Sequence, residues 1–270
     1  MRFEIIDILS RPMRAYIPDG TARAYYRGKR PAVIVFPGGG YEITYEGEAE
    51  PIALRFAAEG LCAFVLDYTV TEVSATVFPR PIKEAFAAVR HVRMHAEEYG
   101  IDPENIATCG FSAGGHLCAC MGTLWNKPEA KQFFDTEKDA SFSRPDKLIL
   151  CYPVIRGCNP GHVYSFYNLF GKENVTDEIL ESYSLQNRVD EKTPPAFLWA
   201  TAADDCVPVA STLDFASALA KHGVKFEVHI WKDGGHGLCL GDQVTQTLPH
   251  GEELPVAEWT RLATNFMYQI

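Results

Sequence analysis

The stretch Gly110-Phe111-Ser112-Ala113-Gly114 decides the fold that we predict for this sequence. It reads G-x-S-x-G and follows a short apolar run, 106–109, that is typical of a strand. Small and apolar residues continue over 115–120 at a density that suits a buried helix. A serine placed between strand and helix by flanking glycines predicts a nucleophile elbow, because the turn is too tight for larger neighbours.

An elbow of this kind leaves the Ser112 hydroxyl at a helix N-terminus. There the helix dipole and the free N–H groups favour developing negative charge. A glycine–serine turn without chemistry is the alternative, because G-x-S-x-G alone also occurs by chance. The strand and helix that flank the motif favour the elbow.

The composition of the 270-residue chain indicates an ordinary folded protein, with 47% hydrophobic and 22% charged residues. No linker, low-complexity run or repeat marks a boundary, so we expect one domain over residues 1–270. The net charge of −10, without a cluster of Lys and Arg, argues against a nucleic-acid partner. No apolar run approaches the roughly 20 residues of a membrane span, so no membrane partner is expected.

The first ten residues include the acidic Glu4 and Asp7 and lack a long apolar segment, so they do not read as a signal peptide. The eight cysteines mostly lie in apolar segments, and none forms a C-x-x-C pair. We therefore expect reduced thiols and a cytoplasmic location. A secreted mature form whose signal has been removed stays open.

Strand-like and helical segments alternate along the chain. Residues 3–9 and 13–17 read as antiparallel edge strands. Further strands are predicted at 32–36, 61–66, 106–109, 148–152, 196–200 and 226–231. Helices are predicted at 48–59, 81–99, after the elbow, at 209–222, and from Pro255 onward. This alternation predicts an α/β fold, with a mostly parallel, doubly wound sheet of about eight strands and helices on both faces.

Between about residues 153 and 195 the periodicity fades and aromatic residues gather. A loop-rich insertion of this length is unusual within a compact domain unless it covers something. We expect it to form a small lid or a pocket wall.

The segment Pro37-Gly38-Gly39-Gly40-Tyr41 follows the predicted buried strand 32–36 directly. Three consecutive glycines weaken a fold, because each loses much backbone entropy. They make sense where backbone N–H groups must face a ligand. A flexible turn is the alternative, and the serine elbow later in the chain favours an oxyanion loop.

A serine hydroxyl needs a base within hydrogen-bond reach, and that base needs an orienting acid. In a doubly wound sheet such groups come from loops at the carboxyl ends of strands. Ser112, Asp204 and His236 each follow a predicted strand in this way. Their order along the chain is the one expected of α/β-hydrolases.

Six motifs, spread over nearly the whole chain, carry a resemblance to a known family. They are P-G-G-G-Y at 37–41, D-Y at 67–68, Y-G-I-D-P at 99–103, G-F-S-A-G-G-H-L at 110–117, D-x-x-V-P at 204–208 and G-H-G-L at 235–238. With them the chain resembles an α/β-hydrolase of the esterase and lipase kind, and most of all the small acetyl xylan esterase-like carbohydrate esterases. Ala200 and Thr201 stand where that family often has His or Gly, a departure that leaves the three functional positions intact.

The resemblance implies that Ser112 is the acylated nucleophile, His236 the general base and later acid, and Asp204 the residue that fixes the histidine tautomer. It implies an oxyanion hole formed by the N–H groups of Ala113 and of Gly39 or Gly40. The implied activity is hydrolysis of short-chain acyl esters, such as acetyl esters, of a small molecule or carbohydrate. Nothing in the sequence calls for a metal or an organic cofactor.

Other residues compete for these roles. Asp205 competes with Asp204, which we prefer because it gives the D-x-x-V-P spacing. His116 competes with His236, but it lies one helical turn beyond the serine and would point away, so we interpret it as a packing residue. We take the pair His91 and His95 as surface histidines, because no third metal ligand lies nearby in the sequence.

The substrate pocket is the least determined part. We expect its shape to depend on the insertion and on side chains such as Tyr41, Tyr68 and Trp125, with Tyr41 and Tyr68 as tentative pocket residues. A peptidase, a formamidase and a lactone hydrolase stay open as activities. A binding protein on a hydrolase scaffold is disfavoured, because all three functional residues are present. The oligomeric state, including a homo-oligomer, is left open.

Overall fold

One eight-stranded sheet organises the chain, with the strand order β1-β2-β4-β3-β5-β6-β7-β8. The computed structural model describes residues 1–18, 28–134, 136–158, 161–249 and 252–269. The strands are β1 (Arg2–Ile8), β2 (Arg11–Ile17), β3 (Arg30–Phe36), β4 (Cys62–Leu66), β5 (Ile101–Phe111), β6 (Lys147–Cys151), β7 (Ala196–Thr201) and β8 (Phe226–Trp231). The predicted number of strands is confirmed.

The sheet is antiparallel at one edge and parallel elsewhere. β1 pairs with β2, and β2 with β4, in antiparallel fashion. From β4 through β3 to β8 every pairing is parallel. The chain leaves β3 to one side for β4 and later returns on the other side as β5, so the strand order reverses there. At such a switch point the carboxyl ends of parallel strands border a crevice, where α/β proteins bind ligands.

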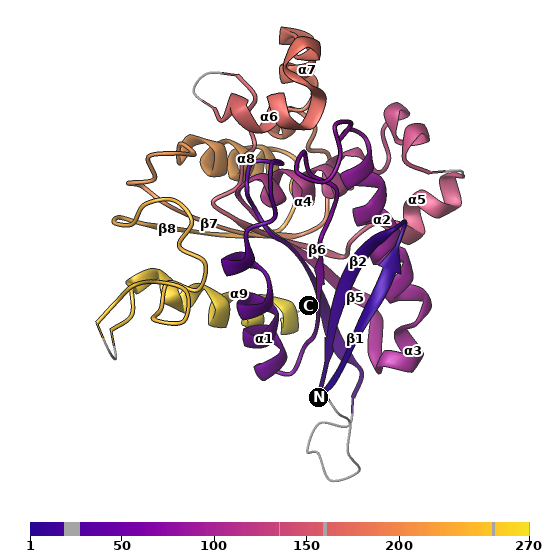
Figure 1. The fold of residues 1–270 in the computed structure, drawn as a ribbon, viewed down its shortest axis with the longest axis vertical. Coiled ribbons are helices and arrows are strands. Elements are labelled where there is room, and N and C mark those ends of the chain that lie inside the picture. Colours follow the sequence, from indigo (N-terminus) through magenta and orange to yellow (C-terminus); the bar gives the residue numbers. More distant parts are fainter. Residues whose placement is uncertain (19–27, 135, 159–160, 250–251, 270) are drawn as a thin grey trace.

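Helices cover both faces of the sheet (Figure 1). They are α1 (Glu50–Ala58), α2 (Arg80–Met94), α3 (Ala96–Tyr99), α4 (Ser112–Leu124), α5 (Glu137–Ser143), α6 (Val163–Phe170), α7 (Asp177–Ser182), α8 (Ala210–Lys221) and α9 (Trp259–Tyr268). The side chains of β3 alternate between two cores, with Ile34 packed on the α2 and α4 side and Val35 on the α1 and α9 side. The prediction of a doubly wound α/β fold is therefore confirmed.

The single helix predicted over 81–99 is divided into α2 and α3 at His95. The imidazole Nδ1 of His95 lies 2.8 Å from the carbonyl oxygen of His91, and the backbone N–H of His95 donates to that same oxygen. Gly100, with φ of +68°, ends α3 in the left-handed conformation that glycine adopts readily.

The segment 153–195 is more helical than its sequence predicts. It contains α6 and α7 and two short 3₁₀ turns, Lys172–Asn174 and Leu185–Asn187. These helices have only eight and six residues, too few to produce a clear periodic pattern in the sequence. In Figure 1 they stand at the top of the view, above α8 and α4.

Two further expectations concern cysteines and membranes. All eight cysteines are free, and six of them are buried. Of the helices in the described ranges, none combines the length and the apolar character that crossing a bilayer requires.

Candidate active site

The predicted elbow is present where β5 ends at Phe111 and α4 begins at Ser112. Ser112 has φ of +50°, a conformation that non-glycine residues rarely adopt. A Cβ atom at Gly110 would collide with the carbonyl oxygen of Gly114, and one at Gly114 with that of Phe36. Both glycines are therefore required by close packing around the serine, which accounts for the motif.

The structure brings Ser112, His236 and Asp204 into one hydrogen-bonded chain. His236 Nε2 lies 2.8 Å from Ser112 Oγ, and His236 Nδ1 lies 2.7 Å from Asp204 Oδ2. A carboxylate only accepts, so Nδ1 carries the proton and Nε2 accepts from the serine hydroxyl. The side chain of Asp204 is 1% exposed and that of His236 is 18% exposed. The histidine therefore stands between a buried acid and a serine that solvent barely reaches.

Asp204 is held as an anion by its surroundings. Its second oxygen, Oδ1, accepts hydrogen bonds from the N–H groups of Cys206 and Val207, each at 2.9 Å. Burial raises the pKa of this carboxyl, but the hydrogen bond and charge of His236, with the two backbone donors, outweigh burial and leave the pKa below its ordinary value. Asp205, its competitor in the sequence, is exposed. Asp204 is thus the one that bonds to His236.

His116 lies inside the core, as the sequence interpretation has it. Its Nδ1 is 3.0 Å from the hydroxyl of Tyr41, and its Nε2 is 3.1 Å from the carbonyl oxygen of Tyr183. Burial lowers the pKa of His116 to about 4, so the ring is neutral at physiological pH. The neutral ring donates from Nε2 to Tyr183 and accepts at Nδ1 from Tyr41. Both nitrogens are engaged away from Ser112.

The glycine loop lies directly against the serine. A Cβ atom at Gly38 would approach Ser112 Cβ to 3.0 Å and the carbonyl oxygen of Phe111 to 2.9 Å. Gly39 and Gly40 have φ of +115° and +65°, and a Cβ atom at Gly39 would collide with the Ile43 carbonyl. The loop therefore needs glycine for both conformation and space.

Ala113 directly follows Ser112, in the first turn of α4. The first N–H groups of a helix have no partner within it, so the Ala113 N–H is available to a ligand next to Ser112. Gly38 is the residue of the glycine loop in contact with Ser112, and the oxyanion role of Gly39, Gly40 and Ala113 stays a prediction.

Tyr41 and Tyr68 do not line a pocket, contrary to the tentative prediction. Both side chains are fully buried. Tyr41 bonds to His116, and the Tyr68 hydroxyl donates to the carbonyl oxygen of Pro37 at 2.5 Å. Both rings belong to the core, and the Tyr68 hydroxyl fixes the carbonyl group at the start of the glycine loop.

The sequence analysis assigned no role to three residues of the insertion that lie near the site. The side-chain amide of Asn168, in α6, donates to the carbonyl oxygen of Gly40 at 2.9 Å. The ring of Tyr164 lies 3.6 Å from where a Gly40 Cβ atom would be, and its hydroxyl donates to Glu42 at 2.7 Å. His162 precedes α6. Burial and the charge of His236 lower the pKa of His162, while Asp204 acts in the opposite sense. No motif in the sequence marks these three positions.

The sequence analysis also missed two buried residues behind the site, Glu48 and Tyr152. Glu48 Oε2 accepts from the N–H of Gly38 at 2.7 Å, and Oε1 accepts from the Tyr152 hydroxyl at 2.6 Å. The sequence did contain a signal for Glu48. It lies four and eight residues before Ile52 and Phe56, so a charged residue shares the apolar stripe of the helical segment.

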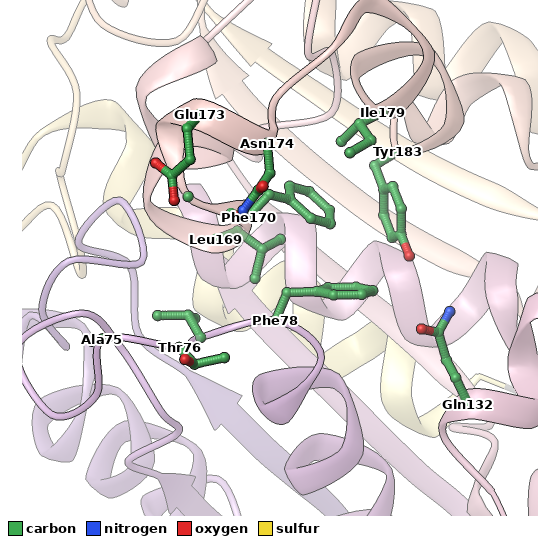
Figure 2. Close-up of a pocket in the computed structure, with 12 residues that line it drawn as sticks. Ala75, Thr76, Phe78, Gln132, Leu169, Phe170, Glu173, Asn174, Ile179 and Tyr183 are labelled. Atoms are coloured by element: carbon green, nitrogen blue, oxygen red, sulfur yellow. Dashed lines mark hydrogen bonds between the residues drawn. The ribbon is translucent and has the colours of Figure 1, made fainter.

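A separate cavity of about 510 Å³ lies under the insertion (Figure 2). The rings of Phe78, Phe170 and Tyr183 gather in it, with Glu173 at one end and Gln132 at the other. The Tyr183 hydroxyl points toward the Gln132 amide in Figure 2. Neither Ser112 nor His236 lines the cavity, so it is distinct from the candidate active site.

Within the part of the chain that the structure describes, no group of three His, Cys, Asp or Glu side chains is arranged to hold a metal ion. The His91 and His95 rings stack at 4.1 Å. The second contact of His91 is with the hydroxyl of Tyr99, 3.2 Å from Nε2. The pair is thus engaged in helix packing.

A mostly parallel sheet that delivers a serine elbow, an aspartate and a histidine in that chain order defines the α/β-hydrolase fold. The chain belongs to the BD-FAE family, whose model matches residues 19–219.

Two curated relatives agree with this assignment. The chain is 37% identical over 215 residues to endo-1,4-beta-xylanase B of Butyrivibrio fibrisolvens, covering 79% of this chain and 33% of that protein. It is 31% identical over 230 residues to the acetylxylan esterase of Xylanibacter ruminicola, covering 80% of this chain and 44% of that protein. The chain therefore spans less than half the length of these curated relatives.

Solved structures match over nearly the whole chain. The acetyl ester-xyloside bifunctional hydrolase from Caldicellulosiruptor lactoaceticus is 39% identical with a TM-score of 0.80, over 95% of this chain and 86% of that one. A carboxylesterase from Lactobacillus plantarum is 27% identical with a TM-score of 0.82, over 99% and 97% of the two chains. The resemblance stated from the six motifs is confirmed.

Proposed function

We propose that this chain is a serine carboxylic-ester hydrolase that acts through an acyl-enzyme on short acyl esters, with acetylated carbohydrates as the substrate class. The observation that carries the proposal is the hydrogen-bonded chain from Ser112 through His236 to Asp204 beside a glycine loop. The relatives named acetylxylan esterase and acetyl ester-xyloside hydrolase support the substrate class.

In the proposed acylation step, Ser112 Oγ bonds to the ester carbonyl carbon while its proton passes to His236 Nε2. The carbonyl electron pair moves onto oxygen, where the N–H groups of Ala113 and of Gly39 or Gly40 stabilise the charge. The intermediate then breaks its bond to the alcohol oxygen, which takes the proton from His236. The alcohol leaves, and the acyl group stays on Ser112.

Deacylation repeats the same sequence with water as nucleophile. Water gives its proton to His236 Nε2, bonds to the acyl carbon, and Ser112 leaves with that proton as the carboxylic acid departs. In both steps the anionic Asp204 holds the ring in the tautomer with Nδ1–H and stabilises the imidazolium. The proposal uses no metal and no organic cofactor.

The insertion over about 153–195 is proposed as a wall of the substrate pocket. Its support is the contact of α6 with the glycine loop through Asn168 and Tyr164. A small-molecule or carbohydrate ester is the proposed partner. The free thiols favour a reducing compartment such as the cytoplasm, which we propose as the location.

Hydrolysis of p-nitrophenyl acetate by the wild type and Ser112→Ala tests the proposal. The variant is expected to lose at least about 10³-fold in kcat, because the acyl-enzyme cannot form. A fluorophosphonate should add once to the wild type, at Ser112 by peptide mapping, and not to the variant. A variant as fast as the wild type, or no label on the wild type, would refute it. A panel of acetylated xylo-oligosaccharides, p-nitrophenyl esters of rising chain length, peptides, formamides and lactones then identifies the preferred substrate.

A further inference from the structure

Glu48 is a charged residue enclosed by the core. It is 2% exposed and belongs to the 3₁₀ turn Glu46–Glu48, just before α1. Glutamate is almost never buried so completely unless it is paired. Its two hydrogen-bond donors are a backbone amide and a phenol rather than a cation, so the carboxyl group is kept in the interior at a cost in solvation. A carboxyl group that is retained in the core at such a cost is a candidate for a functional role.

One oxygen of Glu48 fixes the start of the glycine loop. Oε2 accepts from the Gly38 N–H at 2.7 Å. The carbonyl oxygen of the same peptide unit belongs to Pro37 and accepts from the Tyr68 hydroxyl. Both polar ends of this peptide are therefore held from within the core, which sets its plane next to Ser112. Gly39 and Gly40 follow this fixed peptide directly along the chain.

The other oxygen leads to the histidine. Oε1 accepts from the Tyr152 hydroxyl at 2.6 Å, and that hydroxyl accepts from the N–H of Cys239 at 3.1 Å. Cys239 lies three residues after His236, and the ring centroids of Tyr152 and His236 are 4.9 Å apart. Glu48 thus joins the loops that follow β3, β6 and β8.

Both oxygens of Glu48 act as hydrogen-bond acceptors. The Gly38 N–H can only donate, and the Tyr152 hydroxyl, which already receives the Cys239 N–H, donates to Glu48. Burial is the largest influence and leaves the pKa of Glu48 above its ordinary value, although the hydrogen bonds from Tyr152 and Gly38 and the charge of His236 act in the opposite sense.

We propose that Glu48 is a positioning residue that holds the glycine loop through Gly38 and the histidine loop through Tyr152, so that oxyanion donors and base stay aligned with Ser112. The inference rests on the proposed function. It assigns to this carboxylate an effect on the rate of the chemical steps, beyond any effect on folding.

Glu48→Gln tests the inference, with Glu84→Gln as a matched control. The glutamine amide nitrogen cannot accept, so either Gly38 or Tyr152 then faces another donor. Glu84 is also buried and accepts two hydrogen bonds, from the N–H of Thr69 at 2.7 Å and from its hydroxyl at 2.6 Å, but it does not touch the site. On p-nitrophenyl acetate we expect kcat of Glu48→Gln to fall about 10- to 100-fold with KM changed less than about threefold. For Glu84→Gln, kcat should stay within about threefold of the wild type.

A purely structural role predicts something else. Both variants would then lose thermal stability while kcat per folded molecule, counted by circular dichroism, stayed within about threefold of the wild type. That result would overturn the inference, and so would an equal fall in kcat in both variants.

Tyr152→Phe provides an independent test that does not depend on the folding of Glu48→Gln. It removes only the hydroxyl, and Tyr16→Phe is its control, because Tyr16 also donates to a carboxylate, Glu50, at 3.1 Å. We expect kcat to fall about tenfold in Tyr152→Phe and less than about twofold in Tyr16→Phe. If Glu48 acts through Tyr152, the double variant Glu48→Gln/Tyr152→Phe loses less than the product of the single losses. Unchanged kcat in Tyr152→Phe, or strictly multiplicative losses, would count against the inference.

The two proposals fail in different ways. If Ser112→Ala keeps the wild-type rate, the proposed function is wrong. If Ser112→Ala is inactive and Glu48→Gln is not impaired, only the role of Glu48 is wrong.

Discussion

Ser112 Oγ and His236 Nε2 lie 2.8 Å apart although 124 positions of the chain separate these residues. The sheet explains the approach, because β5 and β8 run parallel and both end at the same edge. The loop after β7, between them in the order of strands, delivers Asp204 to the other side of the imidazole. The meeting of three distant residues is thus a consequence of strand order.

Asp204→Asn and Asp205→Asn separate the two neighbouring carboxylates. An asparagine at position 204 can present its amide to His236 Nδ1 and favour the wrong tautomer, so kcat on p-nitrophenyl acetate should fall about 10³- to 10⁴-fold. Asp205 is exposed, and its variant should keep kcat within about threefold. Steady-state kinetics of both purified variants checks this. Equal losses in the two would contradict the assignment of the acid.

The sequence predicts those parts of this arrangement that are encoded by residues close together in the chain. Each central strand is buried on both faces and reads as an apolar run, so β3 to β7 are recognisable from their residues alone. Ser112, Asp204 and His236 follow such strands directly, so their convergence could be expected.

The errors concern residues whose surroundings come from distant parts of the chain. Tyr41 follows the glycine loop, but its side chain is buried and its hydroxyl is hydrogen-bonded to His116 of α4, 75 positions away. The partner of Glu48 at the far side, Tyr152, is 104 positions away, so no local pattern could reveal it. The sequence did not predict α6 and α7, because each is stabilised by packing within the insertion and against its neighbours rather than by a long amphipathic stripe.

His116 should make the stability of the protein depend on pH. Its pKa is about 4 in the folded chain and 6.5 ordinarily, because the buried ring resists protonation. Between these values the unfolded chain binds a proton that the folded chain does not, so stability falls as pH falls. The expected loss is about 2 kcal/mol from pH 7 to pH 5.

Urea denaturation of the wild type and His116→Gln at both pH values measures this loss. Glutamine does not titrate. The difference in free energy of unfolding, wild type minus variant, should therefore be about 2 kcal/mol smaller at pH 5 than at pH 7. Buried carboxyl groups titrate equally in both proteins and cancel in the comparison. A gap that is the same at both pH values would show that His116 does not titrate as inferred.

Tyr164→Ala tests whether α6 forms the wall that meets the alcohol part of the substrate. Tyr164 is 47% exposed and its ring lies beside Gly40, so it can pack against a bound sugar. Loss of one aromatic contact costs about 1 kcal/mol, which corresponds to a KM about fivefold higher for acetylated xylo-oligosaccharides. The KM for p-nitrophenyl acetate should change less than about twofold.

The control for Tyr164→Ala is Tyr268→Ala, at the C-terminal end of α9. Tyr268 is similarly exposed, at 45%, and its hydroxyl donates to the carbonyl oxygen of Glu59, at the end of α1. It should leave both KM values unchanged. If Tyr164→Ala raises the two KM values equally, the ring does not discriminate by the alcohol part.

Asn168 should matter for rate because its amide holds the carbonyl oxygen of Gly40 at 2.9 Å. Without this bond the loop loses one of its contacts with the insertion, and the amides of Gly39 and Gly40 gain freedom that must be lost again in the transition state. We expect kcat of Asn168→Ala on p-nitrophenyl acetate to fall about five- to tenfold. Asn174→Ala is the matched control, since its amide also donates to a carbonyl at 2.9 Å, but that of Phe170. Its kcat should stay within about twofold, and a comparable fall in both variants would mean that the insertion acts through its general stability rather than through the contact with Gly40.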